Sequence, residues 1–512
     1  MNKPAFVDAL LQPDAYAHPC GEIELIETHI SWVFLTGQFA YKVKKPVSLN
    51  FVDFSTFERR EYFCREELRC NRAFAPELYD DVVPINFADG QYRIEGPGDT
   101  VEWAVRMVQF PTDRQLDRML EAGELPLPAL HEFGGELAAQ HARLPVRTEA
   151  DDVAARVLKP VLDNFRTVAP LGAARPYEGL LSTLAIDSEA LFNALRDTFA
   201  GRVQGGFVRE CHGDLHLSNL VLTDIGVRAF DCLEFNANLR WIDVASDVAF
   251  LLMDCCVRGR EDLAHGFLDG YLNESGDYAG VVLSRYYQAY RSMVRAKVAA
   301  LQIEQGQASA DVAERLDQHL RWADKRLHRD CGHLVLMCGV SGSGKSYLAE
   351  RLVTALPAIR LRSDVARKRL AGMRPAEESD SPVDGGLYTP SNTAQVYARL
   401  LEWAVQIAGG GDHVIVDATF LQRTLREEFL QRAARLGLPC TIVHCYAEPQ
   451  ILTQRVRARE QAGDDVSEAG VAVLERQLQR FEEFADEPVL RVNTGGELDL
   501  PALTQKLLVA QR

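Results

Sequence analysis

The stretch GVSGSGKS, Gly339 to Ser346, matches the pattern G-x-x-x-x-G-K-[ST] and decides the fold of the last third of the chain. An apolar run, HLVLMCGV, leads into it, and a helical pattern, SYLAERLVTAL, follows it. This context predicts a loop that holds the phosphates of ATP or GTP, because glycines let backbone N–H groups turn toward a phosphate and the helix N-terminus adds partial positive charge. We expect Lys345 to reach the β- and γ-phosphates and Ser346 to ligate Mg²⁺. The residues expected to bind the nucleotide are Gly339, Val340, Ser341, Gly342, Ser343, Gly344, Lys345 and Ser346.

Two carboxylates follow later strands of the same region. The runs HVIVDATF and CTIVHCYA read as buried strands with helices between them, which predicts a parallel sheet and an α/β P-loop NTPase domain. Asp364 follows the strand in AIRLRSDVARKRL, and Asp417 ends the strand in VIVD. Ligands bind beyond the carboxyl ends of parallel strands, so one carboxylate can accept a hydroxyl proton and the other can hold Mg²⁺ or the substrate. The alternative interpretation is that both are helix N-caps.

The segment LTQRVRARE places Arg455 and Arg459 four residues apart, on one helical face. That spacing suits a lid that presents guanidinium groups to a transferring phosphate, and a solvated, salt-bridged helix is the alternative. With these motifs, residues 333–512 resemble the P-loop kinase family, which includes gluconate and shikimate kinases, zeta-toxin-like kinases and the 5′-hydroxyl kinase domain of polynucleotide kinases. The resemblance implies that Asp364 is the general base and that Asp417 lies in the substrate and metal site.

A second candidate site lies in HGDLHLSN, far from the glycine loop. Asp214 and Asn219 have the D-x-x-x-x-N spacing of a protein-kinase catalytic loop, in which the Asp is the base and the Asn binds a metal ion. Asp231 follows an apolar run in VRAFDCLEFN, where a second metal-binding carboxylate is expected. This set resembles the aminoglycoside phosphotransferase and choline kinase superfamily, over about residues 20–300.

The superfamily resemblance also assigns residues near the start of the chain. Lys42 in FAYKVKK stands where a strand lysine would hold the α- and β-phosphates, although Lys44 shares its face of the strand. Its helical carboxylate partner would be Glu67 or its neighbour Glu66, and Asp247 in SDVAF would brace the catalytic loop. The chain departs from protein kinases because a G-x-G-x-x-G loop is missing and only the turn Thr36-Gly37-Gln38 stands in its place.

Length and charge agree with two enzyme domains. A chain of 512 residues with 47% hydrophobic and 25% charged residues is expected to form several globular domains. We predict a protein-kinase-like α+β domain over 1–325, a linker at 326–332 and the P-loop kinase domain over 333–512. The first 330 residues carry a net charge of −15 out of the total of −17, which argues against a nucleic-acid partner. We expect no export signal, because MNKPAFVDALLQPDAY has no long apolar run, and eleven cysteines without metal-like spacing favour a cytoplasmic protein with reduced thiols and no membrane association.

The domain order is similar to that of bacterial proteins described as bifunctional aminoglycoside phosphotransferase/ATP-binding proteins. It implies an ATP- and Mg²⁺-dependent enzyme in which each domain transfers a γ-phosphate to a hydroxyl of a small molecule. Two alternatives remain. The N-terminal domain could be a binding or regulatory module without catalysis, or the C-terminal domain could phosphorylate a nucleic-acid 5′-hydroxyl.

Overall fold

The computed structural model describes residues 3–49, 52–147, 152–375, 377, 379, 386–462 and 470–509. Its contacts divide the chain into two compact units. The first comprises Met1–Pro126, Arg143–Asp152 and Thr198–Leu251, and the second comprises Leu127–Ala142, Val153–Asp197 and Leu252–Arg512. In the described part of the chain, no helix is both long and apolar enough to cross a membrane.

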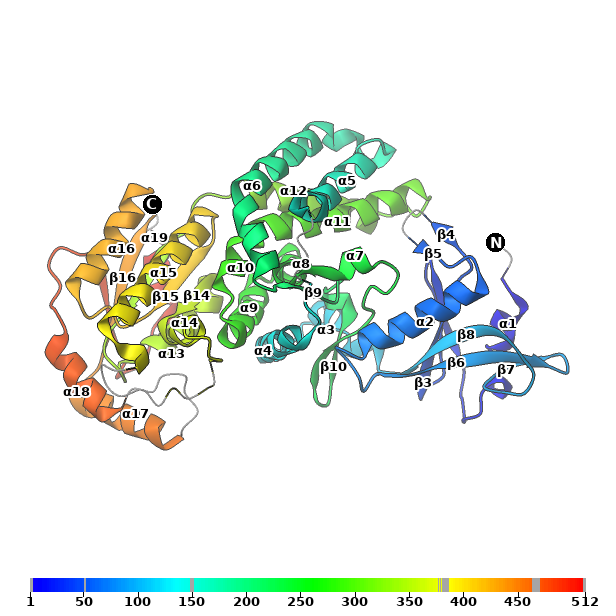
Figure 1. Ribbon diagram of the computed structural model, residues 1–512, viewed down its shortest axis with the longest axis horizontal. Helices are drawn as coiled ribbons and strands as arrows, with labels where there is room; N and C mark the ends of the chain where they lie inside the picture. Colours follow the sequence, from blue (N-terminus) through cyan, green and yellow to red (C-terminus); the bar gives the residue numbers. More distant parts are fainter. Residues whose placement is uncertain are drawn as a thin grey trace. The chain divides into compact units, whose positions relative to one another are not determined.

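The first unit is built on an antiparallel six-stranded sheet. Strand alternation and β-branched residues in its opening segment favour strands, as the sequence predicts. The strands are β1 (Glu24–Glu27), β2 (Ser31–Leu35), β3 (Phe39–Lys44), β6 (Tyr79–Ala88), β7 (Gln91–Ile94) and β8 (Asp99–Val108), in the order β1-β2-β3-β8-β6-β7. Helix α2 (Phe57–Asn71) packs across β8 and β6 (Figure 1).

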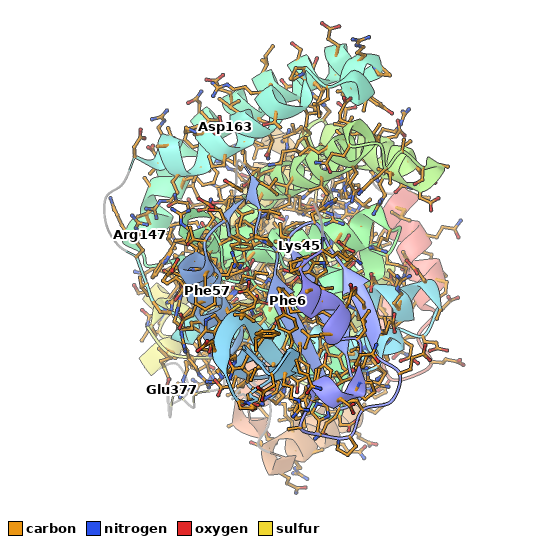
Figure 2. The ribbon with its side chains drawn as sticks, turned by 90° about the vertical axis from the view of Figure 1, so that its right-hand side faces the viewer. Phe6, Lys45, Phe57, Arg147, Asp163 and Glu377 are labelled. Carbon is orange, nitrogen blue, oxygen red and sulfur yellow. The ribbon has the colours of Figure 1, made fainter. Side chains whose placement is uncertain are left out.

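The two faces of this sheet carry different side chains. On one face, Phe6 of α1 (Ala5–Ala9), labelled in Figure 2, packs in a core cluster with its ring centroid 5.8 Å from that of Trp32. Tyr41 belongs to this apolar core. Because successive residues of a strand alternate between faces, Lys42 and Lys44 of β3 point to the other side, toward α2. That alternation gives the unit a dry core on one face and a charged site on the other.

The remaining elements of the first unit form short sheets. Strand β9 (Val208–Glu210) pairs with β12 (Trp241–Asp243), and β10 (Leu220–Thr223) pairs with β11 (Gly226–Ala229), all antiparallel. Two two-residue strands, β4 (Ser48–Leu49) and β5 (Val52–Asp53), pair antiparallel. The helices are α3 (Leu116–Glu121), α7 (Ala237–Arg240) and the beginning of α8 (Val244–Val257).

The second unit contains a helical part and a parallel sheet. The helices before the sheet are α4 (Leu127–Arg143), α5 (Lys159–Val168), α6 (Glu178–Gln204), α9 (Glu261–Ser275), α10 (Tyr278–Val282), α11 (Ser284–Glu304) and α12 (Ala310–Leu327). The sheet consists of β13 (Leu334–Cys338), β14 (Ala358–Arg362), β15 (His413–Asp417), β16 (Cys440–Tyr446) and β17 (Val489–Asn493). Its order is β14-β15-β13-β16-β17, and every pair is parallel.

Helices cover this sheet on both sides, as a parallel sheet requires. Helices α13 (Lys345–Ala355) and α19 (Leu500–Val509) pack on one face, and α15 (Pro390–Gly409) and α16 (Arg423–Arg435) lie on the other (Figure 1). The remaining helices are α14 (Ser363–Leu370), α17 (Pro449–Ala462) and α18 (Val471–Arg480). The predicted fold classes are therefore confirmed, with an antiparallel α+β part followed by an α/β P-loop part. The predicted linker, 326–332, begins inside the last turn of α12 and ends just before β13, within the second unit, and the domain bounds stay a prediction.

Candidate active sites

The loop that carries Asp214 is held by a buried carboxylate. Asp247 of α8 is fully buried and accepts hydrogen bonds from the backbone N–H groups of His212 and Gly213, at 3.1 and 2.9 Å. Burial lowers the pKa of His212, and its Nε2 donates to the carbonyl of Phe230. A neutral imidazole and a carboxylate therefore hold the loop from two sides, as the resemblance predicts for Asp247.

Asp214, Asn219 and Asp231 belong to one small segment of structure. The Asn219 amide donates to the Asp214 carboxylate at 3.1 Å, and His216 Nε2 lies 3.3 Å from the same carboxylate. The β10–β11 hairpin pairs Leu220 with Ala229, and this pairing returns the chain from Asn219 to Asp231. An amide and a carboxylate oxygen at this return are suitable ligands for a magnesium ion.

The two lysines of β3 occupy different environments. Lys42 Nζ lies 2.7 Å from Glu67 and 2.5 Å from Asp231, whose side chain is 46% exposed. Lys44 is fully buried, 2.7 Å from Glu67, and also pairs with Glu234. Burial alone would raise the pKa of Glu67, but the two lysines lower it below its ordinary value. Lys42 therefore contacts Asp231, the carboxylate predicted to bind metal, whereas Lys44 contacts only the buried carboxylates Glu67 and Glu234 among the described salt bridges.

The choice between Glu66 and Glu67 follows from the face of α2. Glu66 is paired with Arg69 and Arg240, whereas Glu67 contacts both lysines. The geometry thus brings together Lys42, Glu67 and Asp231, and their functional roles stay predictions.

The turn expected to replace a glycine-rich loop is short and already bonded. Thr36-Gly37-Gln38 joins β2 to β3, with Gly37 at φ 93°. The Gly37 N–H donates to the side chain of Gln109 at 2.7 Å, and the N–H of Gln109 donates to the Gln38 carbonyl. This turn is fixed to the strand end after β8, so its amide does not serve a phosphate in this arrangement.

In the second unit, Gly339–Ser346 forms a tight loop between β13 and α13. Gly342 and Gly344 have φ near 78° and 77°, a region that favours glycine. A Cβ at Gly342 would lie 2.7 Å from the carbonyl oxygen of Leu452, so both the conformation and the space require glycine there. Lys345 is the first residue of α13, where the helix N-terminus attracts anions.

Ser346 and Asp417 meet at the carboxyl end of the sheet. The Ser346 hydroxyl donates to Asp417 Oδ1 at 3.1 Å, and Asp417 is 5% exposed. Strand β15 lies directly beside β13, so the carboxylate that ends β15 reaches the start of α13. A hydroxyl and a carboxylate oxygen at a phosphate-binding loop fit a magnesium ion, as predicted for both residues.

Asp364 lies one strand further from the loop. Arg362, the last residue of β14, lies opposite Asp417 in the register of the two parallel strands. Asp364 follows two residues later, in the first turn of α14. Arg362 is the N-cap of α14, and Gln422 is the N-cap of the helix after Asp417. The N-cap alternative is therefore wrong for both carboxylates, and both lie where ligands bind in parallel sheets.

Arg455 is bonded to the phosphate-binding loop. Its guanidinium donates to the carbonyl of Gly342 at 3.3 Å and to the carbonyl of Thr494 at 2.7 Å. The alternative of a solvated helix is wrong for this residue. Arg459 lies one turn further along α17 and is half-buried, and its role stays a prediction.

A pocket of about 670 Å³ adjoins Arg455 and the loop. It is lined by Gly344, Tyr347, Arg351, Arg455, Thr494, Gly496, Glu497, Leu498 and Leu500. Because it opens beside the residue that begins the phosphate-binding helix, its place and size suit the base and ribose of a nucleotide.

Most of the chain aligns with a mycobacterial protein. It is 32% identical over 477 residues to uncharacterized protein Rv2004c of Mycobacterium tuberculosis, covering 90% of this chain and 92% of that protein. The chain belongs to the same family as this mycobacterial protein. The family described as "AAA domain" matches residues 334–484, which contain the phosphate-binding loop, Asp364, Asp417 and Arg455.

Solved kinases are similar to each part. A choline/ethanolamine kinase family protein from Mesorhizobium loti is 12% identical, covers 60% of this chain and 88% of its own, and has a TM-score of 0.38. A gluconokinase from Sinorhizobium meliloti is 21% identical, covers 36% of this chain and 93% of its own, and has a TM-score of 0.25.

Three residues at these sites escape motif reasoning. Glu234 pairs with Lys44, Thr494 donates to the carbonyl of Ser343 at 2.7 Å, and Gln477 accepts from the N–H of Ser341 at 2.7 Å. Thr494 follows β17 directly, so the strand-end rule could have found it. Glu234 and Gln477 reach their sites only through tertiary folding, and no local pattern marks them.

Proposed function

We propose that the chain is a two-site phosphotransferase that uses ATP and Mg²⁺ at each site to phosphorylate a hydroxyl of a small molecule. The observation that supports this most is that each unit alone contains a candidate base, a candidate phosphate-binding lysine and side-chain oxygens that could hold a metal ion. In the first unit these are Asp214, Lys42, Asn219 and Asp231. In the second they are Asp364, Lys345, Ser346 and Asp417.

At the C-terminal site, Lys345 and the loop N–H groups would hold the β- and γ-phosphates, and Arg455 would fix the loop. Asp364 would accept the proton of the acceptor hydroxyl. The acceptor oxygen then bonds to the γ-phosphorus while the bond to the β–γ bridging oxygen breaks, giving ADP and a phosphate ester. A magnesium ion on Ser346 and Asp417 would offset phosphate charge when bound.

At the N-terminal site, Asp214 would take the hydroxyl proton, and Asn219 and Asp231 would hold the metal ion. Lys42 would hold phosphate oxygens, with Glu67 fixing its ammonium group. One observation favours a binding or regulatory role for this unit instead. The Gly37 N–H already donates to the Gln109 side chain, so hydrogen bonds to the phosphates from above would have to come from other residues.

The test is a phosphotransfer screen with labelled ATP against a library of metabolites, aminoglycosides and a 5′-hydroxyl oligonucleotide. The full chain is compared with Asp214→Asn and Lys345→Ala. We expect two groups of acceptors, each abolished by one substitution only. If Asp214→Asn abolishes no phosphorylation, the N-terminal unit is a binding module. If the oligonucleotide is the only acceptor that depends on Lys345, the C-terminal site phosphorylates a nucleic-acid 5′-hydroxyl instead of a small molecule.

A further inference from the structure

A buried ion pair inside the second unit lies directly behind the C-terminal site. Arg360 of β14 donates from Nε to Asp269 Oδ1 at 2.9 Å and from Nη2 to Asp269 Oδ2 at 2.7 Å. Both residues are 4% exposed. Asp269 belongs to α9, a helix about 90 residues before β14 in the sequence, so no motif of the P-loop region contains it.

Helix α9 is held rigidly, which fixes the position of this carboxylate. A Cβ at Gly270 would lie 1.9 Å from the carbonyl oxygen of His131 on α4, and one at Gly134 would lie 2.2 Å from that of Phe267. Only glycine permits such an approach of two helix backbones. Every residue of α9 from Leu263 to Leu272 is buried. Asp269 therefore cannot move away if the charge of Arg360 changes.

Arg360 faces the residues predicted to hold magnesium. Its Nη1 lies 3.4 Å from the carbonyl oxygen of Ser346. Burial alone would lower the pKa of Arg360, but Asp269 raises it, and Asp417 and Glu350 raise it further. The hydroxyl of the same Ser346 donates to Asp417 Oδ1 at 3.1 Å, so Arg360 and Asp417 both contact Ser346 and lie near each other. A guanidinium without its own carboxylate at this place would compete with a divalent cation for Asp417.

We propose that Asp269 is a positioning residue of the C-terminal site, which acts by neutralising Arg360 so that Asp417 stays available to a divalent cation. This inference rests on the proposed function of that site. It differs from a role in stability alone, since replacing a buried ion pair with apolar groups can leave stability unchanged. In this inference, the magnesium dependence of nucleotide binding is set by whether the charge of Arg360 is neutralised. It is not set by the contact between α9 and the sheet.

Opposite substitutions separate these two roles. Asp269→Asn leaves a buried cation behind the site and should weaken magnesium-dependent nucleotide binding by at least about tenfold, which corresponds to about 1.4 kcal/mol. Arg360→Met removes that cation and should leave the magnesium dependence equal or stronger. The double variant Asp269→Asn/Arg360→Met should return to the parent value. Because it buries no unpaired charge, it still tests the inference if Asp269→Asn fails to fold.

A matched control lies elsewhere in the same unit. Arg326 and Asp412 form another buried pair, at 2.6 Å, and Asp412 precedes β15 at the opposite end of that strand from Asp417. Asp412→Asn should lower the melting temperature without changing magnesium dependence.

The measurement is calorimetric titration of the full chain with a non-hydrolysable ATP analogue, in Mg²⁺ and in EDTA, together with thermal melting. The C-terminal isotherm is the one that Lys345→Ala removes. The inference is overturned if Asp269→Asn and Asp412→Asn differ only in melting temperature, or if Arg360→Met weakens magnesium-dependent binding as Asp269→Asn does. Absence of a Lys345-dependent isotherm in the parent would instead refute the proposed function.

Discussion

Lys44 and Lys42 stand two residues apart on one face of β3, and substituting each by Met should give opposite outcomes. Lys44 has no exposed side-chain surface and contacts Glu67 and Glu234. Removing a cation from a buried pair leaves uncompensated charge, at a cost of about 3–5 kcal/mol. For a unit of this size each kcal/mol lowers the melting temperature by about 2–4 °C, so Lys44→Met should lower it by roughly 6–20 °C.

Lys42→Met should lower the melting temperature less than Lys44→Met does, and it should lower phosphotransfer at the N-terminal site more. Its side chain is 12% exposed, and its partner Asp231 is 46% exposed, so water can solvate the group that is left. Without a lysine at the phosphates, phosphotransfer at the N-terminal site should be lost, while the C-terminal site keeps its rate. Calorimetric melting and site-resolved phosphotransfer assays on the same preparations measure both effects.

The stability deficit of Lys44→Met should also depend on pH. In the parent protein the lysines lower the pKa of Glu67, so this carboxylate stabilises the fold above the ordinary pKa of about 4.3 and loses that contribution as the pH falls. In the variant, only Lys42 still opposes the effect of burial on Glu67, so the pKa of this carboxyl group is higher than in the parent. The deficit should therefore be largest near neutral pH and shrink toward about pH 4. A parent-like melting temperature for Lys44→Met at neutral pH, or a greater loss with Lys42→Met, would refute this division of roles.

Four further substitutions address the bases, the metal site and the number of nucleotide sites. Asp214→Asn should lower phosphotransfer at the N-terminal site by about 10²–10⁴-fold, the usual effect of removing a general base, and steady-state kinetics with intact C-terminal turnover as control would measure it. Lys345→Ala should remove one of two nucleotide isotherms, and a single stoichiometric site in the parent would contradict this. Asp364→Asn should lower kcat while ATP affinity stays nearly unchanged, whereas Asp417→Asn should weaken binding in Mg²⁺ but not in EDTA. The reverse pattern would exchange the roles of the two carboxylates.

The sequence predicts what depends on local patterns. The glycine loop between an apolar run and a helix forms as expected, because the φ of Gly344 and the buried strand before it are set by nearby residues. Asp417 lies at Ser346 because parallel strands end at one edge, a rule that needs no coordinates. The spacing from Asp214 to Asn219 likewise becomes a direct contact.

What the sequence leaves open depends on contacts between distant segments. Periodicity puts Lys42 and Lys44 on one face, and only the approach of α2 and Asp231 separates them. Asp269 is invisible to motif reading, since its partner Arg360 lies in another part of the chain. Motifs mark groups that contact phosphate, whereas the charges that balance those groups come from whichever element the fold brings near.

Under the proposed function, the two sites would hold phosphate by different physical means and would respond differently to perturbation. The C-terminal loop would add to Lys345 a set of backbone N–H groups fixed by glycine geometry, which no change of protonation can remove. The N-terminal site would depend on Lys42, whose ammonium is placed by Glu67 of α2. A change that shifts or loosens α2 displaces that carboxylate and with it the lysine. Such a change should reduce N-terminal phosphotransfer while leaving the P-loop site untouched, so the stability of α2 against the sheet controls one activity and not the other.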